Sequence, residues 1–561
     1  MISLNHMKKE TRECNKCKNE FTLDQDDFSF YEKMKVPAPD NCPTCRQQQR
    51  ILFRNFKTLY KRPSSKSGKM IISMYNPDVP FPVWDMSEWW ADDWGGEDYA
   101  IDLDLSIPFV KQLGKLANKV PRFSIMNTKS ENCEYSNMVL SSKNCYLNFG
   151  CTYNENCDYG HIVWNSTDCI DNLYVYKCEL CYECIDCVVS NKLFYSQECE
   201  SCADSIGLYD CRDCVNCIGC VGLRHKSYCI FNQQMTKEEY QNFSDKYPIK
   251  DEVSIIYILN KKEELRKKMP ARSVFGSHNN NVSGDHIYGA HNVQQSFDIK
   301  NGGENSLYCY TVNNPVESQD VSFTIGAEYG YQVLTGGGSN NTISTHLIFE
   351  SSYIYYSDTC YNSKNLFGCF GLRNKEYCIL NKQYTKNEYE KLVPQIIENM
   401  KKSGDWGNFF PIWMSPFGYN ESIVNEYTPL TKEQALAQGF KWRDNIPYTI
   451  GQENCHYENL PKNPEEYSDK ILLDKILKCE SCNKNYRFIS REITFYKRMK
   501  LALPNKCFNC RHQKRMDSRN PRVLTEVNCA KCGVKTFTTY PKEKHQIYKI
   551  YCENCYKQEM N

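Results

Sequence analysis

The sequence lacks the patterns that mark membrane-spanning, secreted and nucleotide-binding proteins. It has no run of about 18 apolar residues and no charged-then-apolar leader before Cys14. It has no G-x-G-x-x-G, P-loop, H-E-x-x-H or G-x-S-x-G motif. We therefore expect no membrane partner, no enzymatic activity and an intracellular (cytoplasmic), reducing environment.

The net charge of the whole chain is only +1, because 69 Lys/Arg nearly balance 68 Asp/Glu in 561 residues. This balance hides a split. Residues 1–70 have a net charge of +7 and residues 470–561 of +13, whereas residues 71–469 have −19. Two basic ends that flank an acidic middle suggest separate partners for the two kinds of segment.

Cysteine, by contrast, is abundant, with 33 residues or about 6% of the chain. In a short secreted chain this would indicate disulfides, but a long chain without a leader favours reduced thiols and metal sites.

The two ends are copies of one another and carry paired C-x-x-C motifs. A displacement of 465 residues superimposes the first four cysteines on the second four without a gap, and a third pair of motifs follows at once. Two such turns form a tetrahedral S₄ site for Zn²⁺ with no position left for a reactive water. The sequence predicts about three structural zinc ions per chain, bound by Cys14, Cys17, Cys42 and Cys45, by Cys479, Cys482, Cys507 and Cys510, and by Cys529, Cys532, Cys552 and Cys555.

The first copy reads Cys14-Asn-Lys-Cys17, Phe21, Asp24 to Asp27, Phe30-Tyr31, Pro39, Cys42 and Cys45-Arg46. This pattern resembles the probable zinc-ribbon, treble-clef-like family over about 45 residues at each end. The second copy departs from it, with Tyr486 in place of Phe21 and no acidic run. The order of features along the whole chain resembles a set of uncharacterised Cys-rich zinc-ribbon and repeat proteins, and that resemblance implies an architecture but no activity.

Arginines recur at helical spacing after each second C-x-x-C motif, so a helix would align them on one face. Such rows can bind phosphates, which makes nucleic acid a candidate partner. The alternative is docking on the chain's own acidic body, in which residues 71–110 hold nine Asp/Glu and no Lys/Arg. The predicted nucleic-acid-binding residues are Arg46, Arg50, Arg54, Arg511, Arg515 and Arg519.

Residues 133–229 hold sixteen cysteines, many of them twelve residues apart, as in Cys133, Cys145, Cys157 and Cys169. A helix cannot keep such a stripe on one face, whereas a solenoid of stacked coils can. We predict a right-handed parallel β-helix built from six-residue units, with two, three or four units per coil. The alternative is that some cysteines between 178 and 220 bind metal.

A second lobe is predicted from a second repeat, since GLRHKSYCIFN at 222–232 recurs as GLRNKEYCILN at 371–381, an offset of 149. Each copy is followed by a predicted capping helix. The Trp- and Asp-rich segment before the first ladder is interpreted as a cover, with sugar or base stacking and cation binding as alternatives. A short helix is predicted from Thr431 as N-cap to Gly439 as C-cap.

The predicted fold class is mainly β, a two-lobed parallel β-helix with Cys₄ zinc ribbons at both termini and short capping helices. The predicted domains are a zinc ribbon with a basic arm at 1–70, a covering segment at 71–130, β-helix lobes at 131–270 and 271–403, a connector with a short helix at 404–469, and zinc ribbons at 470–524 and 525–561.

The predicted function is a zinc-binding, non-enzymatic scaffold whose basic ribbons engage nucleic acid. One alternative is a protein-interaction or structural protein that uses the solenoid face. The other is a carbohydrate-active β-helix enzyme, for which Asp320 and Glu328 would be the first catalytic candidates.

Overall fold

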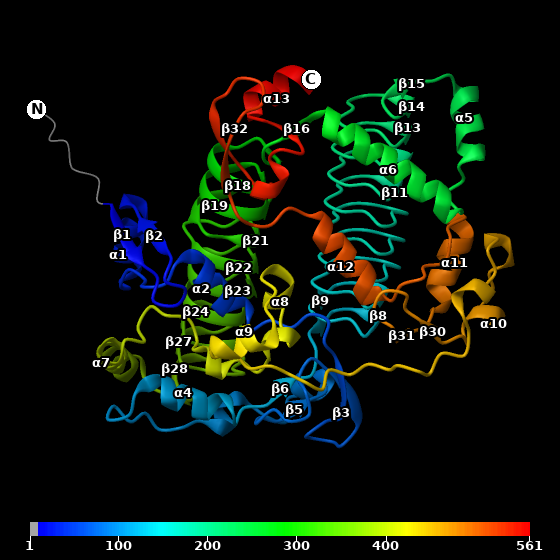
Figure 1. Ribbon diagram of the computed structural model, residues 1–561. Helices are drawn as coiled ribbons and strands as arrows, with labels where there is room; N and C mark the ends of the chain where they lie inside the picture. The colour runs from blue at the N-terminus through cyan, green and yellow to red at the C-terminus, as the bar shows by residue number, and fades with distance from the viewer. Residues whose placement is uncertain (1–8, 561) are drawn as a thin grey trace, which may run out of the picture. The chain divides into compact units, whose positions relative to one another are not determined.

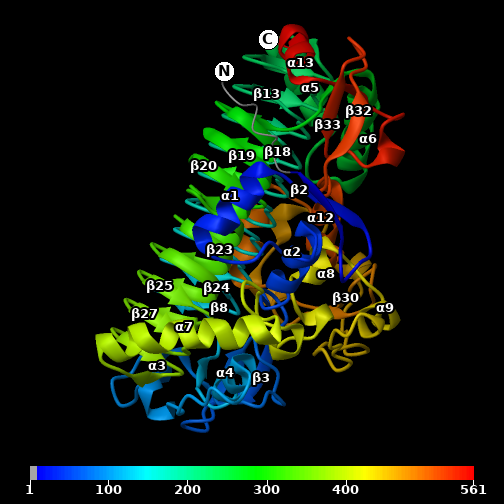
Figure 2. The ribbon, with the colours of Figure 1, turned by 90° about the vertical axis from the view of Figure 1, so that its left-hand side faces the viewer.

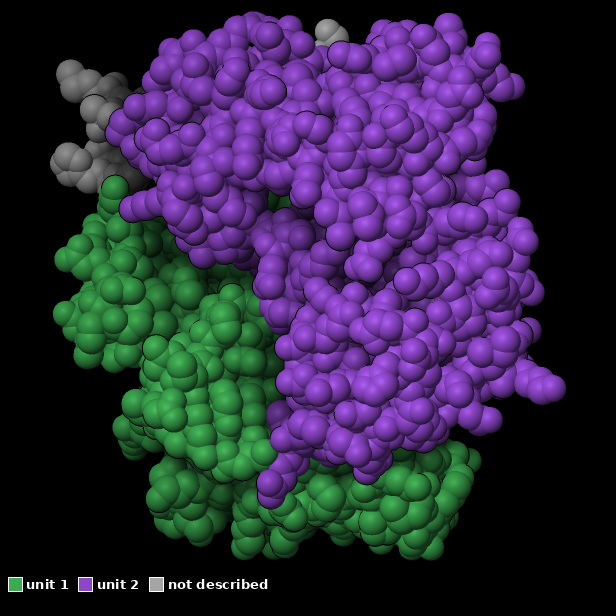
Figure 3. All heavy atoms as spheres, turned by 45° about the vertical axis from the view of Figure 1, so that its right-hand side comes forward, with its two compact units in different colours: residues 1–124, 274–444 green, residues 125–273, 445–561 purple. Residues whose placement is uncertain are grey.

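The computed structural model describes residues 9–560. The first eight residues of the predicted 1–70 segment, where no leader is expected, and the last residue of the predicted 525–561 ribbon lie outside the described residues. Strands make up 30% of the chain and helices 25%. The chain forms two compact units, each made of two stretches of sequence (Figure 3). Unit 1 comprises the described residues up to Ser124 together with Val274–Asp444, and unit 2 comprises Ile125–Ser273 and the described residues from Asn445 onward.

Unit 2 contains the cysteine-rich repeat, which we call the first ladder (127–230). Its strands pair with one another in parallel and form a stack (Figure 1). Each paired residue lies opposite the one twelve positions on, as in Cys133↔Cys145 and Cys217↔Cys229. Between the strands, single bridges with the same spacing continue the pairing along four lines, which begin at 137, 140, 143 and 146. Each stretch of twelve residues therefore has four paired positions, spaced at every third residue. The strands are β7 (Asn127–Thr128), β8 (Glu131–Glu134), β9 (Val139–Leu140), β10 (Lys143–Tyr146), β11 (Asn191–Phe194), β12 (Ala203–Ile206), β13 (Val215–Ile218) and β14 (Ser227–Ile230).

The unit of the first ladder is a triplet that the sequence prediction did not resolve. One residue of each triplet bridges to the residue twelve positions on, the second has a positive φ, and the third is buried in the core. Asn132, Asn144 and Asn156, for example, have φ of 52°, 51° and 52° and precede buried cysteines. Because Asn and Asp tolerate the left-handed region better than other non-glycine residues, they recur directly before the cysteines.

Unit 1 contains the second ladder (276–379), a stack of longer parallel strands that belongs to a 13-stranded sheet. Its register begins with Gly276 opposite Ile287, and the spacing between paired residues widens by two positions where Ala290 lies opposite Gly303. It then settles at the spacing of the first ladder, as in Tyr310↔Ser322. Aliphatic side chains fill most of its core. The strands are β17 (Gly276–Ser277), β18 (Asn280–Tyr288), β19 (Ala290–Lys300), β20 (Gly303–Leu307), β21 (Tyr310–Asn313), β22 (Gln319–Ile325), β23 (Glu328–Gly337), β24 (Asn340–Phe349), β25 (Ser352–Tyr355), β26 (Asp358–Tyr361), β27 (Lys364–Phe367) and β28 (Glu376–Ile379).

A short antiparallel strand and a helix follow each ladder, where the sequence predicts capping helices. β15 (Gln233–Gln234) precedes α5 (Lys237–Lys246) and α6 (Glu252–Lys268), and β29 (Lys382–Gln383) precedes α7 (Lys386–Ser403). Helices α5 and α7 begin with the same capping box, Thr236 with Glu239 and Thr385 with Glu388. Figure 2 shows α7 lying across the end of the second ladder.

The Trp-rich segment of unit 1, which is interpreted from the sequence as a cover, packs against residues near the C-terminal end of the second ladder. The indole of Trp89 is fully buried and packs edge-on against Tyr361, and the guanidinium of Arg373 lies 5.4 Å from the Trp89 ring. Trp90 is 37% exposed. The elements of this segment are β3 (Tyr60–Pro63), β4 (Met70–Ser73), β5 (Val83–Trp84), α3 (Met86–Trp89), α4 (Phe109–Ala117) and β6 (Arg122–Phe123).

The connector is loop-rich, with α8 (Val424–Tyr427), α9 (Lys432–Ala437) and α10 (Asp469–Leu472). Thr431 is the N-cap of α9, as predicted, and its hydroxyl accepts from the N–H of Gln434. The C-cap of α9 is Gln438, one residue before the predicted C-cap, and Gly439 follows with φ 77°.

Candidate metal centres

The twelve predicted ligand cysteines come together in three groups of four. Within each group, all four sulfur atoms lie within 4.8 Å of one another. The groups are Cys14, Cys17, Cys42 and Cys45 in unit 1, and Cys479, Cys482, Cys507 and Cys510 with Cys529, Cys532, Cys552 and Cys555 in unit 2.

The first C-x-x-C motif of each group lies in the turn of a hairpin. The carbonyl of the first cysteine accepts the N–H of the residue four positions on, which is Lys18, Asn483 or Gly533. That residue has φ of 63°, 60° or 75°, so the chain reverses sharply and both sulfur atoms face one side. The hairpins are β1 (Glu10–Glu13) with β2 (Glu20–Leu23), β30 (Leu477–Lys478) with β31 (Asn485–Tyr486), and β32 (Thr525–Asn528) with β33 (Lys535–Thr538).

The second C-x-x-C motif of each group lies at the start of a helix. Cys42 is the N-cap of α2 (Pro43–Ile51) and Cys507 of α12 (Phe508–Ser518), while Cys552 directly precedes α13 (Glu553–Met560). The partial positive charge of a helix N-terminus stabilises thiolates. A hairpin turn and a helix start therefore supply two sulfur atoms each.

The sulfur separations match a tetrahedral site. Sulfur atoms about 2.3 Å from a tetrahedral ion lie about 3.8 Å apart. The Sγ–Sγ distances are 3.7 Å for Cys17 and Cys42, 3.7 Å for Cys482 and Cys507, and 3.8 Å for Cys532 and Cys552. Four thiolates of this geometry suit zinc and leave no open coordination position.

Backbone N–H groups aim at the first cysteine of each group. The N–H of Cys42 donates to Sγ of Cys14 at 3.2 Å, and the N–H of Cys552 donates to Sγ of Cys529 at 3.3 Å. Burial raises the pKa of the Cys529 thiol, but backbone N–H groups from Cys532 and Cys552 outweigh burial and lower it to about 6. The same balance lowers the pKa of Cys479 to about 7.

The ladder thiols have a different environment. None of them belongs to a group of three or more ligand atoms close enough to hold an ion, in the part of the chain that the structure describes. They are buried and donate weakly to backbone carbonyls nine residues on, as Cys184 does to Leu193 at 3.1 Å. Burial raises the pKa of Cys151 to about 12. These cysteines serve as small core residues, so the alternative of metal binding between 178 and 220 finds no support.

The arginine row of the first ribbon faces the second ladder within unit 1. Nε of Arg46 lies 2.8 Å from Asp320 and Nη1 of Arg50 lies 2.9 Å from the other oxygen of the same carboxylate. Arg50 and Asp320 are both 0% exposed. Arg54 donates to Thr335 and stacks on Phe323 at 4.6 Å.

The arginine row of the second ribbon faces the first ladder within unit 2 in the same way. Arg511 and Arg515 share the carboxylate of Asp171, each at 2.9 Å. Arg515 also pairs with Glu183 at 2.7 Å, and Arg519 pairs with Asp186 at 2.7 Å.

These contacts correct the predicted role of the six arginines. Their guanidinium groups are buried against carboxylates, a hydroxyl and aromatic rings of the same chain, so they form no phosphate-binding surface. The alternative of docking on the chain's own acidic body agrees with the geometry, and the partners are carboxylates of the two ladders.

The two interfaces are copies of one another. The 465-residue displacement of the ribbons carries Arg46 to Arg511, and the 149-residue displacement of the ladders carries Asp171 to Asp320. Tyr31 packs edge-on against Tyr331 at 5.7 Å, and their counterparts Tyr496 and Tyr182 do so at 5.8 Å. The matched ladder positions are Tyr159 and Tyr308, Asp168 and Glu317, Asp171 and Asp320, Tyr174 and Phe323, Tyr182 and Tyr331, and Asp186 and Thr335.

Sequence reasoning missed the acidic half of these interfaces. Asp171, Glu183 and Asp186 lie in the ladder repeat, where Asp occurs at many corners and no single Asp stands out. The signal was the 149-residue offset, which aligns Asp171 with Asp320.

The third ribbon docks at the end of the first ladder through its own contacts. Its strand β34 (Lys549–Tyr551) pairs in parallel with β16 (Pro270–Arg272). The hydroxyl of Tyr556 donates to Asp210, which also pairs with Arg224 at 3.0 Å.

Asp320, the first catalytic candidate of the carbohydrate-enzyme alternative, lies in an environment that does not suit catalysis. Asp320 is fully buried between two arginines, whereas Glu328 is exposed at the start of β23. A carboxylate that is locked in two ion pairs is not available as an acid or a nucleophile.

The acidic residues of the Trp-rich segment form no close group of three ligands among the described residues. Asp93 pairs instead with Lys66 at 2.6 Å, and Asp102 pairs with Lys382 at 2.6 Å.

No protein-family model matches the chain, and a search of the curated proteins found no match. Over the described residues, no helix is both long and apolar enough to cross a membrane.

Proposed function

We propose that this chain is a zinc-binding, non-enzymatic scaffold. In this proposal, the two ladders are β-helix lobes whose coils have four short sides, each side being one triplet. Each lobe is clamped by a zinc ribbon that belongs to the far end of the sequence. The observation that supports the proposal best is the duplicated interface. In each copy, two arginines at corresponding positions of a ribbon pair with one aspartate at the corresponding position of a ladder.

The cysteine chemistry supports zinc as the ion. Four-sulfur sites with separations of 3.7–3.8 Å, N–H groups aimed at sulfur and helix N-termini at the second motif are the features of structural zinc sites. The free ladder thiols also favour a reducing compartment.

The ribbons act as clamps in this proposal because their arginines neutralise buried carboxylates. A buried ion pair that loses one partner destabilises a protein by about 3–5 kcal/mol. Removing zinc would loosen the hairpin and the helix start that hold each arginine row. Zinc and ladder stability are therefore linked.

Nucleic-acid binding stays a prediction without assigned residues. The scaffold proposal needs no phosphate contact from the first two ribbons. A solenoid with covered ends and docked ribbons suits the protein-interaction alternative better.

The proposal is tested by thermal unfolding of Cys482→Ser beside a matched control, Cys455→Ser. Cys455 is half-buried and lies outside the three cysteine groups. We expect Cys482→Ser to lower the apparent Tm on the order of 10 °C and to remove one zinc, while Cys455→Ser changes neither. Equal melting of the two variants would contradict the clamp.

A further inference from the structure

The two duplicated units differ at one place beside the arginine row. In unit 1, residues 405–410 lie between the second ladder and the first ribbon and contact both, and we call the space that they occupy the groove. The indole of Trp406 is 4% exposed and donates to the carbonyl of Lys35 at 2.9 Å. Gly407 lies so close to Pro37 that a Cβ would come within 2.9 Å of it.

Neutral side chains hold the backbone of this segment. Gln332 donates to the carbonyl of Gly407 at 2.9 Å, and Ser344 donates to that of Asn408 at 2.8 Å. From the ribbon, Gln49 donates to the carbonyl of Phe410 at 3.0 Å. The groove of unit 1 therefore binds a segment of chain through its carbonyl groups and one indole ring.

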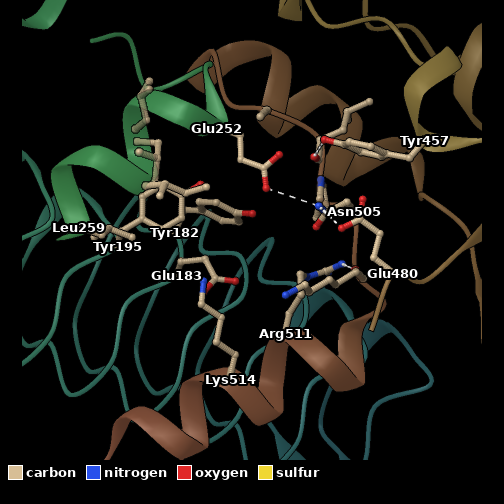
Figure 4. Close-up of a pocket in the computed structure, with 17 residues that line it drawn as sticks. Tyr182, Glu183, Tyr195, Glu252, Leu259, Tyr457, Glu480, Asn505, Arg511 and Lys514 are labelled. Carbon is tan, nitrogen blue, oxygen red and sulfur yellow. Dashed lines mark hydrogen bonds between the residues drawn. The ribbon is translucent and has the colours of Figure 1, made fainter. Parts of the chain in front are cut away.

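The matching groove of unit 2 is hollow. The counterparts of Gln332, Ser344 and Gln49 are Glu183, Tyr195 and Lys514. These three residues line a cavity of about 230 Å³ (Figure 4).

The chain segment that would fill this cavity by analogy with unit 1 is helical instead. Position 406 corresponds to Tyr257 in α6, and Tyr257 stacks on Tyr247 at 4.7 Å rather than entering the groove. The α6 residues Ile255, Ile256 and Leu259 form one wall of the cavity.

The cavity has the size and lining for one aromatic side chain. A cavity of roughly 150 Å³ holds benzene, and sites for drug-sized ligands begin at roughly 300 Å³. Tyr182 and Tyr195 meet edge-to-face at 5.4 Å and supply aromatic surface. Figure 4 shows Glu183 and Lys514 on one side of the space and Glu252 and Glu480 across it.

A second hollow of about 480 Å³ adjoins the first and shares Glu252, Tyr457, Ala502 and Leu503 with it. At its edge, Val253 is 73% exposed, and Ile256 of the first hollow is 51% exposed. Together the two hollows give an extended chain room to continue beyond one side chain.

We propose that the first hollow of unit 2, which Tyr195 and Lys514 line, is a binding site for an extended peptide segment of a partner protein. The segment carries an aromatic side chain. The ring enters between Tyr195 and the α6 wall. Lys514 donates to a backbone carbonyl, as Gln49 does in unit 1, and Glu183 accepts a backbone N–H or a basic side chain. This inference rests on the proposed scaffold function and names the chemistry of its partner.

The test uses the full chain, loaded with zinc, and a fluorescent synthetic peptide with the sequence of residues 402–412. We expect saturable binding in fluorescence anisotropy and at least a tenfold weaker affinity for the peptide with Trp406→Ala. In the protein, Ile256→Trp fills the hollow and Lys514→Glu reverses the donor, and each change is expected to weaken binding at least tenfold.

Matched controls are Asn260→Trp, on an exposed face of α6, and Lys497→Glu, on the exposed surface of the second ribbon. Both are expected to change the affinity less than twofold. Zinc content and apparent Tm, measured on every variant, separate loss of the site from loss of the scaffold. Absence of saturable binding up to about 1 mM peptide, or binding that survives both Ile256→Trp and Lys514→Glu, overturns the proposal.

Discussion

At the scale of single residues, two ladder aspartates join the ribbons to the ladders. Asp171 and Asp320 each accept two arginines while fully buried. Asp320→Ala leaves Arg46 and Arg50 buried without their charge partner, and we expect it to destabilise unit 1 by about 3–5 kcal/mol. Denaturant unfolding measures the change.

The control for this prediction is Glu328→Ala on the neighbouring strand, where the side chain is exposed. Its cost should stay below about 0.5 kcal/mol. If Asp320→Ala costs no more than Glu328→Ala, the arginine rows are not clamps.

Glu492 gives a pH dependence that can be checked. Burial raises its pKa to about 7, against the opposing effect of Arg511, while the unfolded value is about 4.3. Because the folded pKa is the higher one, its contribution to stability is fully present below about pH 4.3 and is lost as pH rises through about 7.

Glu492→Gln removes this titration, so the free energy of unfolding should fall less between pH 5 and pH 8 than in the unmodified chain. Denaturant melts at the two pH values test this, with exposed Glu465→Gln as the matched control. An identical pH dependence in both variants would contradict the assignment.

At the scale of elements, the sequence predicted the repeat but not its unit. The regular spacing of Cys133, Cys145 and Cys157 agrees with the pairing register. The triplet was missed because the left-handed residue of each triplet is set by the backbone and can be Tyr, Lys or Leu as well as Asn. The pattern of apolar and polar residues therefore does not predict which residues have a positive φ.

The triplet predicts that glycine is tolerated better than valine at Asn144, the reverse of the usual order in a strand. This residue has φ 51° and donates to Asn156 at 3.1 Å while it accepts from Asn132 at 3.2 Å. Asn144→Val loses both bonds and adds left-handed strain of about 1–2 kcal/mol, whereas Asn144→Gly loses the bonds alone.

We therefore expect Asn144→Val to destabilise unit 2 by about 2–3 kcal/mol and Asn144→Gly by about 1 kcal/mol, measured by denaturant unfolding. The neighbouring Lys143→Val, at an exposed extended position, should cost less than about 0.5 kcal/mol. A glycine variant less stable than the valine variant would rule out the left-handed triplet.

At the scale of the whole molecule, the internal repeats give two kinds of information. Paired C-x-x-C spacing predicted all three cysteine groups, because four sulfur atoms in two tight turns have few other arrangements. The partners of the arginine rows could not be predicted, since each ribbon docks on a ladder that is distant in sequence, as Arg46 does on Asp320 and Arg511 on Asp171. Proximity across that distance is fixed by folding and not by local pattern.

The number of zinc ions per chain, measured by elemental analysis of protein purified under reducing conditions, tests the zinc-binding scaffold most directly. The expected number is about three per chain, one for each cysteine group, with the ladder thiols free. A chain without zinc, with disulfides in place of thiols, would contradict the zinc-binding scaffold. Five or more zinc ions per chain would mean that the ladder binds metal as well.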